Sequence, residues 1–383
     1  MATNRKLFEE VGEGGRPTQP PAGGMIDAGR RGARGAIRAW LWVLFALVVV
    51  MIAVGGLTRL TDSGLSITEW RPVTGALPPL STEAWEAELE KYRQSPQYQL
   101  QNAGMSLSEF QFIYWWEWGH RQLGRVIGLV WAAGFLFFLA TKKTPTGWNS
   151  RLLLLGVLGG AQGAIGWWMV SSGLVGDRVS VASYRLATHL GLAFVILGFI
   201  AWYVYSLGRE ERVLMQARRL AEPKLFSMST GLLHFAFLQI LLGALVAGID
   251  AGRNYPSWPL MEGALWPSDM LVLEPLWRNF FENAGLVQFM HRMAGYLLAI
   301  FGVVVWLRGR RSPNTDTRFR FNAVLAALLL QVVLGIVTVV YAAPWHIAIL
   351  HQLGAVLLWA VILRARFAAR YPVEQSVRGR KTA

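Results

Sequence analysis

The sequence predicts an all-α polytopic membrane protein with eight transmembrane helices, arranged as two tandem parallel four-helix bundles with both termini cytoplasmic. Three observations predict this fold: a composition of 54% hydrophobic and only 16% charged residues, eight long apolar stretches, and an internal repeat. A helix needs about 20 apolar residues to cross the roughly 30 Å hydrocarbon core of a membrane. The stretches of that length are 39–58, 122–141, 151–170, 186–206, 229–249, 286–307, 321–342 and 346–364.

The basic residues predict the orientation of these spans. If both termini are cytoplasmic, 26 of the 37 Lys and Arg residues lie in inner segments, whereas 14 of the 23 acidic residues lie outside. Inner loops of membrane proteins carry such an excess of basic residues, so the distribution favours cytoplasmic termini. The net charge of +14 needs no nucleic-acid partner, because basic loops beside an anionic inner leaflet account for it.

The second half of the chain repeats the first, span by span. A unit of four helices ends on the side where it began, so both copies enter the membrane from the same side and are parallel repeats. The matching motifs are Glu117-x2-His120-Arg121 with Gln288-x2-His291-Arg292, Gln162-x3-Gly166 with Gln331-x3-Gly335, and His189 with His351. The predicted organisation is a cytoplasmic basic tail (1–38), an N-terminal four-helix bundle (39–206), a cytoplasmic linker (207–228), a C-terminal four-helix bundle (229–366) and a cytoplasmic tail (367–383).

Four of the six histidines occupy matched positions at the outer ends of the even-numbered spans, and these are His120, His189, His291 and His351. The chain has no cysteine, so disulfides, iron–sulfur clusters and thiolate-bound zinc are excluded. One His from each of two facing helices is suited to binding a haem iron on both faces. A hydrogen-bonded packing role is the alternative for a single intramembrane His, but four matched positions favour ligands.

Several neighbouring residues allow two interpretations of their role. Arg121 and Arg292 directly follow two of the histidines, and they either hold haem propionates through paired bonds or snorkel to the interface. We expect His234 to pack inside the fifth span, and His346 to be a solvated residue of the short outer turn. The remaining candidates are glycines that pack helices closely or admit a macrocycle, namely Gly124, Gly166, Gly295 and Gly335.

One matched position differs in its chemistry: Glu117 in the first copy corresponds to Gln288 in the second. Three residues before a histidine, either side chain shares the helix face of that histidine. A carboxyl group beside a haem can take or deliver protons, whereas an amide cannot. The first copy would then hold the reactive site and the second a permanent cofactor. We expect apolar walls around Glu117, and the alternative is an interfacial Glu that faces outer water.

At these residues the chain resembles the haem A synthase family. The resemblance covers roughly residues 36–366 and rests on the tandem architecture, the four histidines, the Glu117-x2-His120-Arg121 motif and the segment Gly56-Leu-Thr-Arg59-Leu-Thr-Asp-Ser-Gly64. It implies oxidation of the C8 methyl group of haem O to a formyl group by successive hydroxylations, which gives haem A for cytochrome oxidase.

The resemblance also implies the role of each residue. His291 and His351 match the ligands of a haem b cofactor, whereas His120 and His189 match the pair at the iron of the substrate haem. Glu117 matches the catalytic carboxylate. A haem O synthase, which is a protohaem farnesyltransferase, is the implied neighbour, and a homo-oligomer is compatible with the chain. The sequence does not identify the electron donor or acceptor.

The absence of cysteine places the resemblance in the cysteine-free branch of alphaproteobacteria and mitochondria. The N-terminal tail includes the acidic residues Glu9, Glu10, Glu13 and Asp27, unlike a transit peptide, so we expect a bacterial inner membrane.

Two other classes of protein also have many helices and an internal repeat. A di-haem b-type electron-transfer cytochrome would use two bis-His sites, but a relay across the membrane needs haems at different depths. A transporter would usually have broken helices and polar residues at the membrane midplane, which are sparse here.

Overall fold

The computed structural model describes residues 32–176 and 178–375, and within these ranges it is built from helices. The prediction of eight helices long and apolar enough to span a membrane is confirmed. They are α1 (Arg34–Leu60), α4 (Leu107–Ala140), α5 (Asn149–Val170), α6 (Ser183–Leu207), α8 (Pro223–Gly248), α10 (Ala284–Gly309), α11 (Thr315–Val340) and α12 (Trp345–Arg370). The acidic residues of the N-terminal tail lie outside the described residues.

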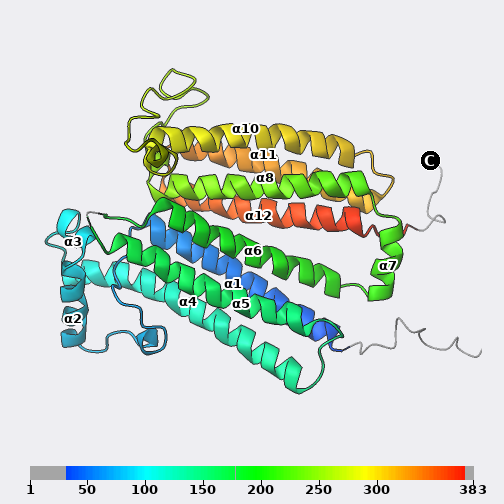
Figure 1. Ribbon diagram of the computed structural model, residues 1–383, viewed down its shortest axis with the longest axis horizontal. Helices are drawn as coiled ribbons and strands as arrows, with labels where there is room; N and C mark the ends of the chain where they lie inside the picture. The colour runs from blue at the N-terminus through cyan, green and yellow to red at the C-terminus, as the bar shows by residue number, and fades with distance from the viewer. Residues whose placement is uncertain (1–31, 177, 376–383) are drawn as a thin grey trace, which may run out of the picture.

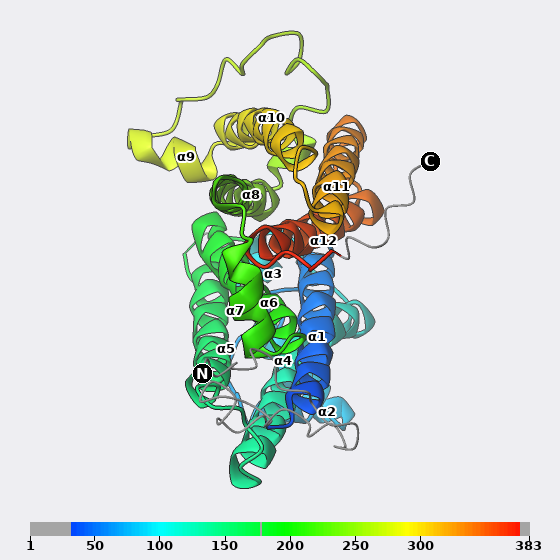
Figure 2. The same cartoon turned by 90° about the vertical axis from the view of Figure 1, so that its right-hand side faces the viewer.

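The long helices lie in two groups of four (Figures 1 and 2). Helices α1, α4, α5 and α6 form one group and α8, α10, α11 and α12 the other, and they meet where α6 contacts α8 and α12 and where α1 contacts α12. The largest apolar core crosses this junction, because it joins Trp359 and Leu363 of α12 to side chains of α1 and α6.

Polar contacts also join the two groups. Arg59 at the end of α1 pairs with Asp250, which follows α8, at 2.5 Å and with Asp62 at 2.8 Å. Gln352 of α12 donates a hydrogen bond to the carbonyl oxygen of Ile52 on α1, at 2.6 Å. A β-carbon at Gly56 would collide with the Gln352 amide. The first helix therefore fits closely against the last one.

The short helices lie at the two ends of the long ones. One end, called the capped end below, has α2 and α3 beside the start of α4, and the opposite end has α7 (Figure 1). The short helices are η1 (Thr74–Ala76), α2 (Thr82–Arg93), α3 (Pro96–Leu100), η2 (Ser171–Gly173), α7 (Glu211–Arg219), η3 (Ala251–Arg253), η4 (Leu276–Arg278) and α9 (Asn279–Glu282).

Tyr92 of α2 forms hydrogen bonds that link α2 to α3 and to the segment after it, and these segments are called the cap below. The Tyr92 hydroxyl group donates to Gln97 Oε1 at 2.9 Å and accepts from Asn102 Nδ2 at 2.7 Å. Gln97 in turn donates to the carbonyl oxygen of Asp62, at 3.1 Å. Burial raises the pKa of Tyr92 to about 12, so the hydroxyl group keeps its proton at neutral pH.

The predicted start of the second span, at residue 122, is wrong. Helix α4 begins at Leu107, where Ser106 and Glu109 form a capping box that satisfies exposed backbone donors. The early turns bury Phe110 and Tyr114 against the cap. A search for apolar stretches misses such turns because protein, and not lipid, covers their apolar face. His120 therefore lies more than three turns inside its helix, and not at the helix entry.

Other boundaries also differ from the predicted ones. Helix α8 begins at Pro223, so the predicted linker 207–228 includes α7 and the first turns of α8. Helix α12 continues to Arg370, beyond the predicted end at 364. His346 is the second residue of α12 and not part of the preceding turn, although its side chain is exposed as predicted.

Candidate functional site

The structure brings the four predicted histidines together as two pairs, one in each group of helices. In the second group, the rings of His291 on α10 and His351 on α12 have centroids 6.4 Å apart and are nearly perpendicular, at 89°. In the first group, His120 on α4 and His189 on α6 are close enough to interact electrostatically. All four side chains are half-buried.

The spacing of the second pair fits one metal ion between two imidazoles. Imidazole nitrogens bind first-row metals at about 2 Å, and each ring centre lies about 1 Å behind its nitrogen. Two axial rings on one iron therefore have centroids roughly 6 Å apart, as His291 and His351 have. A porphyrin supplies the other four nitrogen ligands, so two histidines suffice for a haem.

Each of these imidazole rings lies against a glycine of a neighbouring helix. A β-carbon built on any of the four glycines would approach the ring to 2.9–3.0 Å, closer than β-carbons ordinarily come. The glycines therefore create the space in which each ring lies. The pairs are Gly55 with His120, Gly166 with His189, Gly243 with His291, and Gly335 with His351. The close-packing role predicted for Gly166 and Gly335 is confirmed, whereas sequence reasoning missed Gly55 and Gly243.

A glutamine one turn before the glycine contacts three of the four histidines. Gln162 donates to the backbone carbonyl of His189 at 3.0 Å, Gln239 to that of His291 at 2.9 Å, and Gln331 to that of His351 at 2.9 Å. Gln162 and Gln239 also lie 3.1–3.3 Å from both ring nitrogens of their histidines. Gln239 was missed, although Gln239-x3-Gly243 has the same spacing as the two motifs that were found.

Arg292 has unused hydrogen-bond donors beside the second pair. It is only 9% exposed, and its Nη2 donates to the carbonyl oxygen of Tyr255 at 2.7 Å. Its Nε and Nη1 atoms are buried and have no partner in the part of the chain that the structure describes. Gln288 donates to the carbonyl oxygen of Ala251 at 2.9 Å and brings no charge. A buried, uncompensated guanidinium group is suited to a carboxylate such as a haem propionate.

The corresponding residues of the first group neutralise one another. Glu117 is 3% exposed and accepts from Arg121 Nη2 at 2.5 Å and Nε at 3.1 Å. It also accepts from the Ser66 hydroxyl group at 2.8 Å and the Ile67 amide at 2.9 Å. The expected apolar walls are therefore wrong, and so is a Glu that faces outer water. Arg121 is occupied by this pair and by the carbonyl oxygens of Ile67 and Glu69.

The two remaining histidines lie away from both pairs. The expectation that His234 packs inside its span is wrong, because the side chain is exposed on α8 and its Nδ1 contacts the carbonyl oxygen of Thr230 at 2.8 Å. His346 is exposed beside Trp345.

The interior of the first group is open just beyond its histidines. On α5, Gly166 faces α6 and Gly156 faces Trp131 of α4. Gly159 and Gly163 lie between these two directions on the helix, so they point into the bundle. Both are exposed, and a β-carbon on either would meet no atom within 4 Å.

The second group fills the same positions. Leu328 and Val332 precede Gly335 by the same numbers of residues as Gly159 and Gly163 precede Gly166. Leu328 is 3% exposed and packs against Gly302 of α10. The two interiors therefore differ by an isobutyl and an isopropyl group.

Comparison with known proteins gives consistent matches along the chain. A family model described as cytochrome oxidase assembly protein matches residues 38–363. The chain is 70% identical to the heme A synthase of Ruegeria sp. (strain TM1040), across 98% of this chain and 100% of that protein. It is 67% identical to the heme A synthase of Roseobacter denitrificans, across 99% and 100%, and 65% identical to that of Paracoccus denitrificans, across 98% of both chains.

The contact between glycine and imidazole leads to a first prediction. Gly243→Val should remove most of any haem that binds between His291 and His351, because the added methyl groups need the space of the His291 ring. The haem absorbance per purified protein measures this loss. Gly231→Val on the same helix is the matched control, since its β-carbon meets Phe301 only at 3.5 Å. Equal haem content in both variants would contradict the prediction.

Proposed function

The chain belongs to the haem A synthase family of cytochrome oxidase assembly proteins, and we propose that it oxidises the C8 methyl group of haem O to a formyl group in successive hydroxylations. The observation behind this reaction is the difference between two otherwise matching histidine pairs. One pair has a carboxylate three residues before its first histidine, and the other has an amide. Only a carboxylate can accept a proton and give it up again, whereas a neutral amide does neither. A di-haem electron-transfer cytochrome is not favoured.

The second group of helices is our proposed site of a resident haem b. His291 and His351 have the separation that two ligands of one iron need. The unpaired donors of Arg292 favour an anionic propionate beside them. Haem b, when bound, supplies a one-electron carrier. The second group has the apolar side chains of Leu328 and Val332 where the first group has glycines, which suits a cofactor without a long tail.

The first group is our proposed site of the substrate. Haem O has a farnesyl tail that haem b lacks, so its site must accept a long apolar chain. The open interior at Gly159 and Gly163 adjoins the histidine pair and is wider than its counterpart in the second group. His120 and His189 would hold the iron, while the tail extends past the two glycines.

Glu117 is our proposed proton acceptor. With oxygen from water, conversion of a methyl group to a formyl group releases four electrons, which an external acceptor must take, and four protons, so the reaction needs a base beside the substrate. The bonds from Arg121, Ser66 and Ile67 fix the Glu117 carboxylate one helical turn from His120. The Ser66 hydroxyl group both donates and accepts, so it can pass a proton onwards from Glu117 Oε2.

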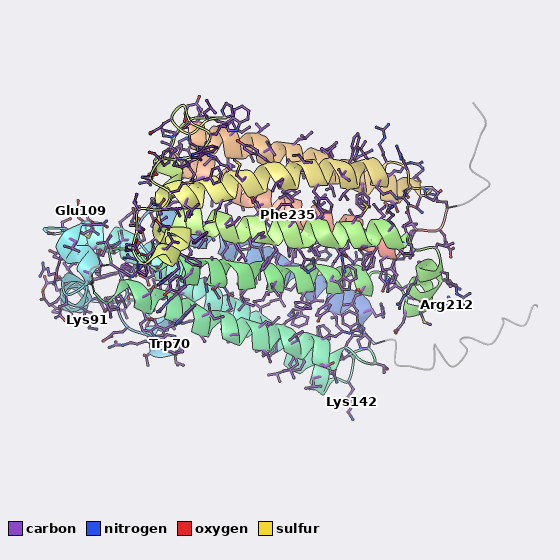
Figure 3. The ribbon with its side chains drawn as sticks, turned by 45° about the horizontal axis from the view of Figure 1, so that its top comes forward. Trp70, Lys91, Glu109, Lys142, Arg212 and Phe235 are labelled. Carbon is purple, nitrogen blue, oxygen red and sulfur yellow. The ribbon has the colours of Figure 1, made fainter. Side chains whose placement is uncertain are left out.

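We propose that the protein is a multi-pass protein of a bacterial inner membrane with its capped end outside. Figure 3 places Lys142 and Arg212 together at the end opposite to Trp70 and Glu109. Basic residues gather at the cytoplasmic ends of membrane helices, which supports this orientation. Haem O arriving from a haem O synthase would then be oxidised near the outer surface.

Alanine substitutions in the two histidine pairs should change the bound haems in different ways. His291→Ala or His351→Ala should lose haem b, because each removes one of its two axial ligands. His120→Ala or His189→Ala should keep haem b but accumulate no haem A. Extraction and chromatography of the bound haems distinguish these outcomes, and equal loss of haem b in all four variants would exclude separate sites.

Glu117→Gln tests the chemistry. The side chain keeps its size but cannot take up a proton, so the rate of haem A formation should fall about a hundred- to ten-thousand-fold while haem O or a hydroxylated intermediate accumulates. Glu109→Gln on the same helix is the control, because that exposed carboxylate only closes the capping box with Ser106, which an amide also does. Undiminished haem A formation by Glu117→Gln would exclude the proton role.

Gly159→Leu tests the placement of the tail. It copies Leu328 into the first group, so the variant should retain haem b and contain little haem O or haem A. Gly160→Leu is the matched control on the same helix, because it copies Leu329, which is exposed. Normal haem O and haem A content in Gly159→Leu would place the farnesyl tail elsewhere.

A further inference from the structure

The support of the four histidines is uneven. Three of the neighbouring helices have a glutamine four residues before the glycine, but α1 has Met51 four residues before Gly55. Within the described residues, the structure gives no side-chain hydrogen bond to the His120 ring. Met51 lies in the corresponding place, and its methyl group is 3.4 Å from where a β-carbon on Gly124 would be.

The glutamines are neighbours of the kind that supports a metal-bound histidine. A hydrogen-bonded neighbour that is not itself a ligand orients the histidine and makes it a stronger ligand. Gln162, Gln239 and Gln331 each donate to the backbone carbonyl oxygen of their histidine, at 2.9–3.0 Å. Among the described residues, Gln331 reaches only the backbone of His351 and not its ring.

The amide groups of Gln162 and Gln239 also reach the rings, because their nitrogens lie 3.2 and 3.1 Å from Nδ1 of His189 and His291. The thioether of Met51 has no N–H group, so it cannot donate such a hydrogen bond. His120 is thus the one ligand of the four whose neighbour on the adjoining helix brings no amide.

We propose that Gln162, Gln239 and Gln331 are positioning residues that make three histidines strong ligands of a haem iron. Met51 leaves His120 as the weakest ligand, from which the iron dissociates first. This inference rests on the proposed function, in which the first group must release haem A after each turnover and the second must keep its haem b. Both ligands of the resident haem have a glutamine. The substrate haem has one supported ligand, His189, and one unsupported ligand, His120.

The test is to exchange the two side chains. Met51→Gln gives His120 an amide, so release of haem A to excess apomyoglobin should slow about 10- to 100-fold, which is the usual effect of a hydrogen-bond partner behind a metal ligand. The first-group haem should also become more fully low-spin in its absorption spectrum. Met51→Leu is the matched control and should release haem A at the wild-type rate.

Gln239→Met is the reciprocal variant, and its measurement needs no catalysis. It should let haem b pass to apomyoglobin at least ten times faster than in the wild-type protein. Unchanged release of haem A by Met51→Gln, or of haem b by Gln239→Met, would overturn the inference. If the wild-type protein binds haem b but contains neither haem O nor haem A, the proposed function fails instead. If Met51→Gln does not fold, Gln239→Met alone decides.

Discussion

The close approach of a glycine to each imidazole ring is the contact on which both sites depend. A helix pair in a membrane gains little from the hydrophobic effect, so close packing and hydrogen bonds decide how its members fit. At Gly55, Gly166, Gly243 and Gly335 the absent side chain gives the space in which a ring lies. The same four contacts set the depth of the rings, and so the depth at which an iron atom can bind.

The repeat keeps this geometry and changes the charge. In the first group, Arg121 is neutralised by Glu117, and both are tied to the loop that follows α1. In the second group, the uncharged Gln288 stands in place of Glu117, and two donors of Arg292 have no partner among the described residues. The difference between Glu117 and Gln288 therefore makes the first site neutral and leaves the second site positively charged. At buried positions such a difference in charge has large effects.

Much of the fold could be predicted because the membrane restricts what a chain can do. Polar residues such as His189 and His351 are easy to recognise in apolar helices, and these two occupy matching positions in the two halves of the sequence. The early turns of α4 were missed because Phe110 and Tyr114 pack against a cap of protein and not against lipid. The surroundings of Glu117 could not be predicted, because its partners Ser66 and Ile67 lie about 50 residues away in an irregular loop.

The contact between α1 and α12 has a consequence for biogenesis. The first helix leaves the ribosome long before the last, so until α12 is inserted, Gly56 and the Ile52 carbonyl face lipid or a chaperone instead of Gln352. Arg59 likewise lacks its ion pair with Asp250 until the segment after α8 has been synthesised. A chain that stops before α12 leaves this surface of α1 uncovered. The first helix therefore reaches its final packing only after the last helix has been inserted.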